Sequence, residues 1–387
     1  MRRDALLTAL AVLLGPALLH GGDPIFDPSK LHEVRIEMDP SDWESLRTNY
    51  LTDQYYAANI SLDNTVVQQV GIRSRGSGSR DAVKPGLKVD FNKYVSGQEF
   101  HGYKSLVLDN LVQDTSLLRE RLAFKVFEAM GIPAPQNAFA RLTVNNEYAG
   151  VYNLVEPVSK PFLKARLGDD SGNLFDYEYS GEYFFTYSGP DPGAYIPDPF
   201  QPQTHEEDLD PSGLLEFIRV VNEAPDATVI QDVGRFLDVN QFLTYLAVEN
   251  ALAEYDGLLG EFGMNNFYLY QYGGQSKFVF IPWDKDTSLS SPNWPIFQRV
   301  GDNVLTRRLL NDLSVQAIYV GAVKKAVGSY LNSRWLLPEL EKGYTQIREA
   351  VLLDPKKPFT NDQFELAVLG LRGIVASREA DVMAQAP

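Results

Sequence analysis

Two acidic residues follow directly on an apolar strand in the sequence FVFIPWDKD. The strand FVFIP occupies residues 278–282, and Asp284 and Asp286 come just after it. With the preceding segment NNFYLYQY and the turn GGQS, this strand is predicted to form a hairpin. Because a hairpin brings its two ends together, we expect Asn266 and Asp284 to meet Asp256, which lies in the loop before the hairpin.

Carboxylate and amide oxygens at one point suggest a metal site. They are hard donors, which suit Mg²⁺ or Mn²⁺ better than zinc. Such a cation bridges phosphate oxygens, and phosphoryl transfer needs mainly positioning, charge neutralisation and an acid that orients the nucleophile. We therefore predict that the carboxylates of Asp256, Asp284 and Asp286 and the amide oxygen of Asn266 form a metal-dependent site for phosphoryl transfer. Taken alone, acids at this position also fit a simple strand end and turn.

A glycine-rich segment upstream, RSRGSGSR at residues 73–80, is predicted to form a loop between two strands. Backbone N–H groups of such loops can bind phosphate. Arg75, Gly76 and Ser77 are therefore candidate phosphate-binding residues. Two plainer interpretations stay open, because the arginines also suit surface ion pairs and a lone GxG is typical of flexible turns.

A lysine and a glutamate next to this loop could complete a nucleotide site. Lys84 and Lys88 follow it, with Lys88 on the strand LKVDF, and Glu120 falls in a helix predicted to begin near Asp114. Protein kinases hold nucleotide phosphates with a strand lysine paired to a helix glutamate. The segment YNLVEP, which contains Glu156, is predicted to lead into a connection where backbone groups meet an adenine. Both glutamates also fit ordinary surface charges.

The composition narrows the chemistry further. The chain has 387 residues, a net charge of −16 and a sequence pI of about 4.8, which disfavours nucleic acid as a partner. It has no cysteine, which excludes thiol catalysis, disulfides and cysteine-bound zinc. Its four histidines lie far apart in the sequence, so a histidine metal site is not expected.

The first residues have the pattern of an export signal. Arg2 and Arg3 precede an apolar run from Ala5 to Leu19, which is short for a membrane span. We predict a signal peptide over residues 1–22 and an exported protein without a membrane span after its removal. A short N-terminal helix of a cytosolic protein is the alternative interpretation.

Strand and helix patterns divide the remaining chain in two. Residues 30–157 are predicted to be rich in strands, with one clear helix, and residues 158–387 are predicted to be mostly helical. Residues 180–211 are rich in proline, acids and aromatic residues, which predicts a long loop. The predicted fold class is α+β, with a β-rich N-terminal lobe and an α-rich C-terminal lobe over 23–387.

At these residues the sequence resembles the CotH kinase family of secreted and spore-coat proteins. The matching segments are GIRSRGSGS, KPGLKVDF, LLRERLAFKVFEAMGIPAP, VNNEYAGVYNLVE, NNFYLY and FIPWDKD, in family order over roughly residues 33–290. The resemblance departs at RGSGS and at KPGLK, and the second departure leaves the choice between Lys84 and Lys88 open. The strings HRD and DFG are absent, and residues 300–387 carry no recognised motif.

The resemblance implies a two-lobed atypical protein-kinase fold. It also implies phosphorylation of a secreted or surface protein that depends on ATP and a divalent metal. It places Asp256 in the catalytic loop, Asn266 and Asp284 on the metal and Lys88 on the phosphates. Two rival functions stay open: a catalytically idle surface scaffold or adhesin, and a metal-dependent hydrolase that cleaves a phosphoester without a nucleotide donor.

Overall fold

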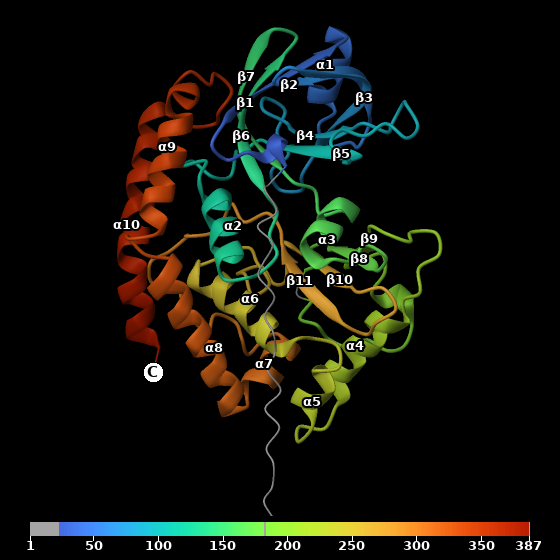
Figure 1. Cartoon of the computed structure of the whole chain (residues 1–387), viewed down its shortest axis with the longest axis vertical. Helices are drawn as coiled ribbons and strands as arrows, with labels where there is room; N and C mark the ends of the chain where they lie inside the picture. The colour runs from blue at the N-terminus through green and yellow to red at the C-terminus, as the bar shows by residue number, and fades with distance from the viewer. Residues whose placement is uncertain (1–22, 182, 387) are drawn as a thin grey trace, which may run out of the picture.

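A β-barrel lies at one end of the molecule, and helices around a small second sheet form the rest (Figure 1). The computed structural model describes residues 23–181 and 183–386. The fold class is therefore α+β, as the strand and helix patterns predict. The proposed signal peptide over 1–22 lies outside the described residues. Within the described part, no helix is both long and apolar enough to cross a bilayer.

Seven strands close the barrel, because β1 pairs in parallel with β6 while every other neighbouring pair is antiparallel. Leu87 and Val89 are fully buried, so the alternation of side chains along the strand turns Lys88 to the opposite face. In barrel order the strands are β1 (Leu31–Met38), β2 (Tyr56–Leu62), β3 (Thr65–Arg75), β4 (Gly86–Asp90), β5 (Ser105–Asp109), β7 (Glu147–Val155) and β6 (Asn137–Val144).

Two helices accompany the barrel. Helix α1 (Pro40–Thr48) begins after Asp39, whose carboxylate accepts from the N–H of Ser41. Helix α2 (Arg119–Ala129) begins five residues later than the sequence predicts. The reason is a tight turn, in which Leu117 has φ +60° and the Asp114 carboxylate accepts from the N–H of Arg119 at 2.8 Å.

The second sheet has four strands in the order β11 (Phe278–Pro282), β10 (Phe267–Gln271), β8 (Asn173–Tyr177) and β9 (Phe200–Pro202). Strands β10 and β11 form the predicted hairpin, with Phe267 opposite Pro282. The chain between β8 and β9 is mostly irregular and contains only the short turn η2 (Pro192–Ala194) among its described residues. This agrees with the long loop predicted from its composition.

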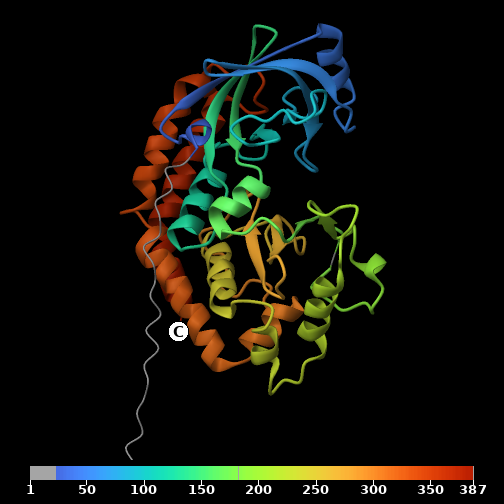
Figure 2. The same ribbon diagram turned by 45° about the vertical axis from the view of Figure 1, so that its right-hand side comes forward.

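Helices pack around this sheet and build the larger hydrophobic core. They are α3 (Lys160–Leu167), α4 (Ser212–Glu223), α5 (Val229–Val233), α6 (Val239–Ala251), α7 (Val304–Leu310) and α8 (Leu313–Lys325), which continues into the π-helical turn η3 (Ala326–Tyr330). The long helices α9 (Leu336–Leu352) and α10 (Asn361–Gln385) form an antiparallel pair along one side. Their connecting turn lies beside the barrel, and the end of α10 lies beside α8 (Figures 1 and 2).

Candidate functional site

A cavity of about 1240 Å³ lies between the barrel and the second sheet. Cationic side chains from the barrel strands line one side, and polar and aromatic side chains from the second sheet line the other. Pro157, Val158 and Ser159, in the connection between β7 and α3, form part of its wall. The barrel side presents Arg73, Arg75, Gly76, Ser77, Arg80, Lys88 and Lys104, and the opposite side presents Asp176, Asn265, Asn266, Tyr268, Trp283 and Asp284.

The cationic side of the cavity comes from the paired strands β3 and β4, where Arg73 stands opposite Lys88. The guanidinium of Arg73 is paired with Asp53 at 2.8 Å. Lys88 has neither a side-chain hydrogen bond nor an ion pair within the described chain. Burial and the nearby charge of Arg73 lower the pKa of Lys88. A lysine that faces a cavity without an anionic partner is suited to bind an anionic ligand.

Arg75 is the cation that reaches toward the acids of the site. Its guanidinium pairs with Asp109 at 3.0 Å, and its Cζ atom lies over the ring of Trp283, 5.9 Å from the ring centroid. Although burial lowers the pKa of Arg75, the carboxylates of Asp109 and Asp284 more than offset this and raise it. Arg75 therefore stays charged between the barrel and the strand end at Asp284.

The glycine-rich loop needs its first glycine. Gly76 has φ +108°, and a Cβ atom there would lie 2.5 Å from the hydroxyl oxygen of Ser79. Arg80 donates from Nε to the carbonyl oxygen of Gly76 at 2.7 Å and also pairs with Asp53. The loop is thus folded back and held, with Gly76 and Ser77 at the cavity surface.

The hairpin brings three predicted site residues together at one end. The amide nitrogen of Asn266 donates to the carbonyl oxygen of Asp256 at 2.8 Å and to its carboxylate at 3.2 Å. The N–H of Trp283, next to Asp284, donates to the carbonyl oxygen of Asn266 at 3.2 Å. Both Asn266 and Asp284 have left-handed backbone, with φ +56° and +48°. Such conformations are uncommon for residues other than glycine and cluster at functional sites.

Asn265 and Lys285 hold this arrangement in place. Asn265 donates to both carboxylate oxygens of Asp256 at 3.1 Å. The ammonium of Lys285 is completely buried and donates to Glu249 and to the carbonyl oxygen of Asn266, each at 2.8 Å. Lys285 therefore turns away from its two acidic neighbours in sequence and fixes the loop before the hairpin.

The acids near the cavity are stabilised in their neutral forms by burial and by one another. Burial, followed by the charge of Asp109, raises the pKa of Asp284 to about 7. Burial and then Asp284 raise the pKa of Asp286 well above its ordinary value. Burial and then Asp109 do the same to the pKa of Glu120. Neither Asp284 nor Asp286 has a hydrogen bond or ion pair through its side chain in the described residues.

These acids fit a divalent cation held jointly with a ligand. Asn266 uses its amide nitrogen on Asp256, which leaves its side-chain oxygen as an acceptor, and both Asn266 and Asp284 line the cavity. No group of three or more acids, cysteines or histidines has metal-holding geometry among the residues that the structure describes. Asp284 and Asn266 alone supply too few oxygens, so further ligands must come from water or a bound phosphate, as is usual for Mg²⁺.

One predicted pairing is wrong. Glu120 does not pair with Lys88; instead it accepts a 2.5 Å hydrogen bond from the amide nitrogen of Asn153 on β7. The physical reason is strand order, because β5 lies between β4, which carries Lys88, and β7. The cation whose pKa responds to Glu120 is Arg75.

Two other predicted residues lie away from the cavity. Lys84 is buried in an ion pair with Asp354 at 2.8 Å. Glu156 accepts hydrogen bonds from the hydroxyl of Tyr103 at 2.8 Å and from the N–H of Gln136 at 2.9 Å. Neither residue lines the cavity, and the polar side chain of each is bonded to other groups of the protein.

Sequence reasoning missed Asp109, Asn265 and the cationic Arg80 and Lys104. Asp109 carried a usable signal, because it ends the strand SLVLD just as Asp284 follows FVFIP. Asn265 stands beside Asn266 in the tandem NN, and no feature of the sequence separates their roles. The positions of Arg80 and Lys104 depend on how loops fold back onto the barrel edge.

Comparison with known proteins identifies the family of this chain. The family model described as CotH kinase protein matches residues 72–380, which includes every cavity residue discussed above except Asp53. The chain belongs to the CotH family.

Several CotH relatives are recognisable along most of the chain. Inner spore coat protein H of Bacillus subtilis is 26% identical, with 87% of this chain and 92% of the relative covered. Invasin CotH3 of Rhizopus delemar is 23% identical over 78% of this chain and 52% of its own length. A solved structure of the Helicobacter pylori proinflammatory kinase CtkA has a TM-score of 0.32 at 10% identity, with 78% and 92% coverage. That score is too low to establish a shared fold.

Proposed function

We propose that this CotH protein is an exported kinase that transfers phosphate from ATP to a hydroxyl of a secreted or surface protein. In this proposal the barrel, about residues 30–157, and the helical part, about 158–387, act as the two lobes of an atypical protein-kinase fold. The observation that carries the proposal is the cavity itself, in which cationic groups of the barrel face Asn266 and Asp284.

The basic side of the cavity suits the triphosphate. Lys88 has no anionic partner in the described chain and contributes a positive charge. The N–H groups around Gly76 and Ser77 are donors of the kind that cradle phosphates. Arg75 is held between Asp109 and the strand end at Asp284 and links the phosphate region to the acids. Together they would neutralise charge that builds up on the transferring group.

The acidic side suits Mg²⁺ or Mn²⁺, which would neutralise phosphate charge and orient the phosphate being transferred. Asp284 and the side-chain oxygen of Asn266 would hold that ion, with Asp286 as the assisting acid. Asp256 would accept a hydrogen bond from the acceptor hydroxyl and align it. Asn265 and Asn266 keep that carboxylate oriented, and burial raises its pKa.

The test is phosphate transfer by purified residues 23–387 with γ-labelled ATP and Mg²⁺ or Mn²⁺. A casein-like acceptor is added, and label is also sought on the protein itself. Asp284→Asn serves as the inactive variant. Asp226→Asn, a change at an exposed acid beside Arg308, serves as the matched control.

Label that depends on Asp284 and persists in Asp226→Asn supports the kinase. Absence of label together with no ATP-dependent rise in Tm overturns it in favour of the idle scaffold. Release of phosphate from a phosphoester without nucleotide would instead identify the hydrolase.

A further inference from the structure

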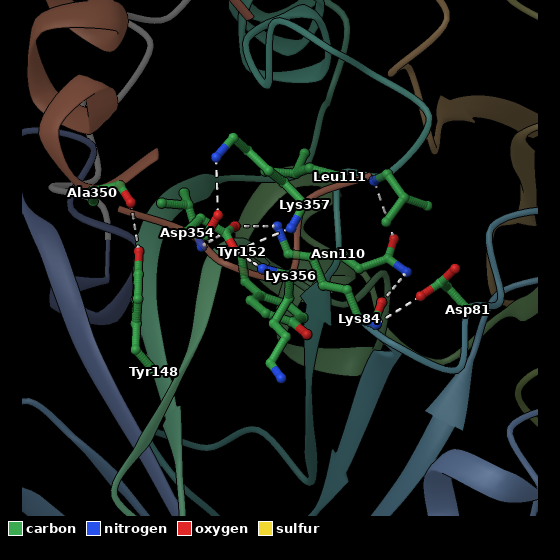
Figure 3. A network of polar contacts seen from close by, with 12 residues as sticks. Asp81, Lys84, Asn110, Leu111, Tyr148, Tyr152, Ala350, Asp354, Lys356 and Lys357 are labelled. Atoms are coloured by element: carbon green, nitrogen blue, oxygen red, sulfur yellow. Dashed lines mark hydrogen bonds and ion pairs between the residues drawn. The ribbon is translucent and has the colours of Figure 1, made fainter. Parts of the chain in front are cut away.

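The turn between α9 and α10 inserts a buried acid into the side of the barrel (Figure 3). Asp354 in this turn is 3% exposed. Its Oδ2 atom accepts from the ammonium of Lys84 at 2.8 Å and from the N–H of Val151 at 3.2 Å. Its Oδ1 atom accepts from the N–H groups of Lys356 and Lys357 at 2.8 and 3.2 Å. This acid therefore has four donors, in contrast to Asp284 and Asp286.

Strand β7 is shaped to receive the turn. Gly150 has φ +116°, and a Cβ atom at this position would lie 2.2 Å from Oδ2 of Asp354. The hydroxyl of Tyr148 donates to the carbonyl oxygen of Ala350, at the end of α9, at 2.9 Å. The ammonium of Lys84 lies 5.2 Å from the ring centroid of Tyr152. The contact is thus built from both sides and is not a chance meeting of surface charges.

The contact continues from Lys84 into the glycine-rich loop. The amide nitrogen of Asn110 donates to the carbonyl oxygens of Lys84 and Ser79, at 2.8 and 2.9 Å. The hydroxyl of Tyr152 donates to the carbonyl oxygen of Pro85 at 3.1 Å. Ser79 lies three residues after Gly76, and it is Gly76 that lines the cavity. A chain of direct contacts therefore runs from Asp354 through Lys84 and Asn110 to the loop.

The other end of α10 is fixed to the helical part. The fully buried guanidinium of Arg378 donates to the carbonyl oxygens of Asn250 and Ala251, at the end of α6, at 2.7 and 2.8 Å. Helix α6 leads into the loop that carries Asp256. The α9–α10 pair is thus attached near the glycine-rich loop at one end and near the Asp256 loop at the other.

We propose that Asp354 is a positioning residue. It acts through Lys84 and Asn110 and holds the connection between β3 and β4, residues 76–85, in place at the cavity. This connection contains the glycine-rich loop. The expected effect of Asp354 on ATP binding rests on the proposed function, whereas its effect on the position of the loop does not. Lys84 in this view holds the loop and does not touch phosphate. The C-terminal helices, which carry no recognised sequence motif, then have a specific role in shaping the nucleotide site.

The decisive variant is the double replacement Lys84→Met with Asp354→Asn. It removes the ion pair but leaves no unpaired buried charge, and the side-chain oxygen of the introduced asparagine can still accept from the N–H groups of Lys356 and Lys357. Loss of a buried pair to uncharged groups is often tolerated, so this variant should fold. The control is Val375→Ala, which truncates a fully buried side chain of α10 without touching the loop.

Two measurements are made on each protein: hydrogen–deuterium exchange of peptides covering 76–85, and the KM for ATP against kcat. In the double variant we expect faster exchange confined to 76–85 and a rise in KM on the order of tenfold, with kcat nearly unchanged. Val375→Ala should lower Tm without a selective change in these peptides. A purely structural pair would behave like the control.

Unchanged exchange over 76–85 in the double variant overturns the proposal, whatever the enzyme activity. Faster exchange with an unchanged KM also overturns it, since the loop would then be held without effect on the nucleotide. If the wild-type protein binds no ATP, the kinase proposal fails, and selective exchange over 76–85 still decides whether Asp354 positions the loop.

Discussion

Two groups of buried charges in this protein differ in how completely they are paired. At the α9–α10 turn, Asp354 accepts from four donors and its cation Lys84 is 1% exposed. Asp284 at the cavity wall and the buried Asp286 two residues later have no hydrogen bond or ion pair through their side chains in the described residues, and burial and neighbouring acids raise their pKa values.

The difference separates buried charges that already have partners in the protein from buried acids that can still bind a ligand. Burial of an ion is costly unless donors compensate it, so a fully compensated acid is stable as the protein stands. An acid that lacks donors is stabilised when a cation arrives. The first group therefore holds chain segments in position, and the second is the better candidate for binding a metal with its phosphate ligand.

The largest expected effect is loss of catalysis from the uncompensated group. Replacement of Asp284 by Asn should lower kcat/KM for phosphate transfer on the order of a thousandfold, because a charge at the reacting phosphate is lost. It should not lower Tm, since it removes a buried carboxyl that lacks donors. Steady-state kinetics and thermal unfolding measure both. Full activity in this variant would contradict the assignment of Asp284.

A loss of stability is expected instead from the buried ion pair of Lys285 and Glu249, which lies next to the site. Lys285→Met leaves Glu249 buried without its cation and should lower the free energy of unfolding by about 3–5 kcal/mol. Urea unfolding measures this change. The double variant Lys285→Met with Glu249→Gln should recover much of the stability, and failure to recover any would mean that the ion pair is not the cause.

Binding of a metal should stabilise the folded protein only when Asp284 is present. Saturating Mg²⁺, at about a hundred times its Kd, should stabilise the wild-type protein by about 2.7 kcal/mol through binding to the folded state. Asp284→Asn should lose this gain, whereas the Lys84→Met, Asp354→Asn double variant should keep most of it. Thermal unfolding with Mg²⁺ and with EDTA provides the comparison. Equal stabilisation of all three proteins would place the metal elsewhere.

A pH dependence of stability is expected from an acid at the cavity wall. Burial, and then the charge of Glu178, raise the pKa of Asp176 to about 7. Because the folded protein binds this proton more tightly than the unfolded chain, its stabilising contribution is present in acid and is lost as pH rises through about 7. Asp176→Asn should therefore flatten the fall in Tm between about pH 4 and 7. An unchanged pH profile would contradict it.

Much of the architecture was predictable from local patterns. Strand patterns predicted a strand-rich region over residues 30–157, where the barrel lies, and the hairpin FYLYQ and FVFIP formed where expected. Helix α2 was predicted with the right residues but with too early a start, because the turn at Leu117 depends on hydrogen bonds of the buried Asp114 side chain. Periodicity reports which residues are apolar and does not report such a turn.

Part of the site was also predictable from local sequence patterns. Two strands joined by a short turn must place Asn266 beside Asp284, and this required no knowledge of the rest of the chain. The pairing of Glu120 with Lys88 was wrong because it required the order of strands in the barrel. The partner of Lys84 was beyond reach, since Asp354 lies 270 residues away in sequence.

Side-chain periodicity and short turns were enough to predict most strands and helices and the meeting of Asn266, Asp284 and Asp256. The closure of the barrel and the partner of each buried charge became known from the folded chain. The physical reason is that the stability of a buried charge depends on every donor and acid removed from water with it. Those neighbours come from distant segments that no local pattern relates.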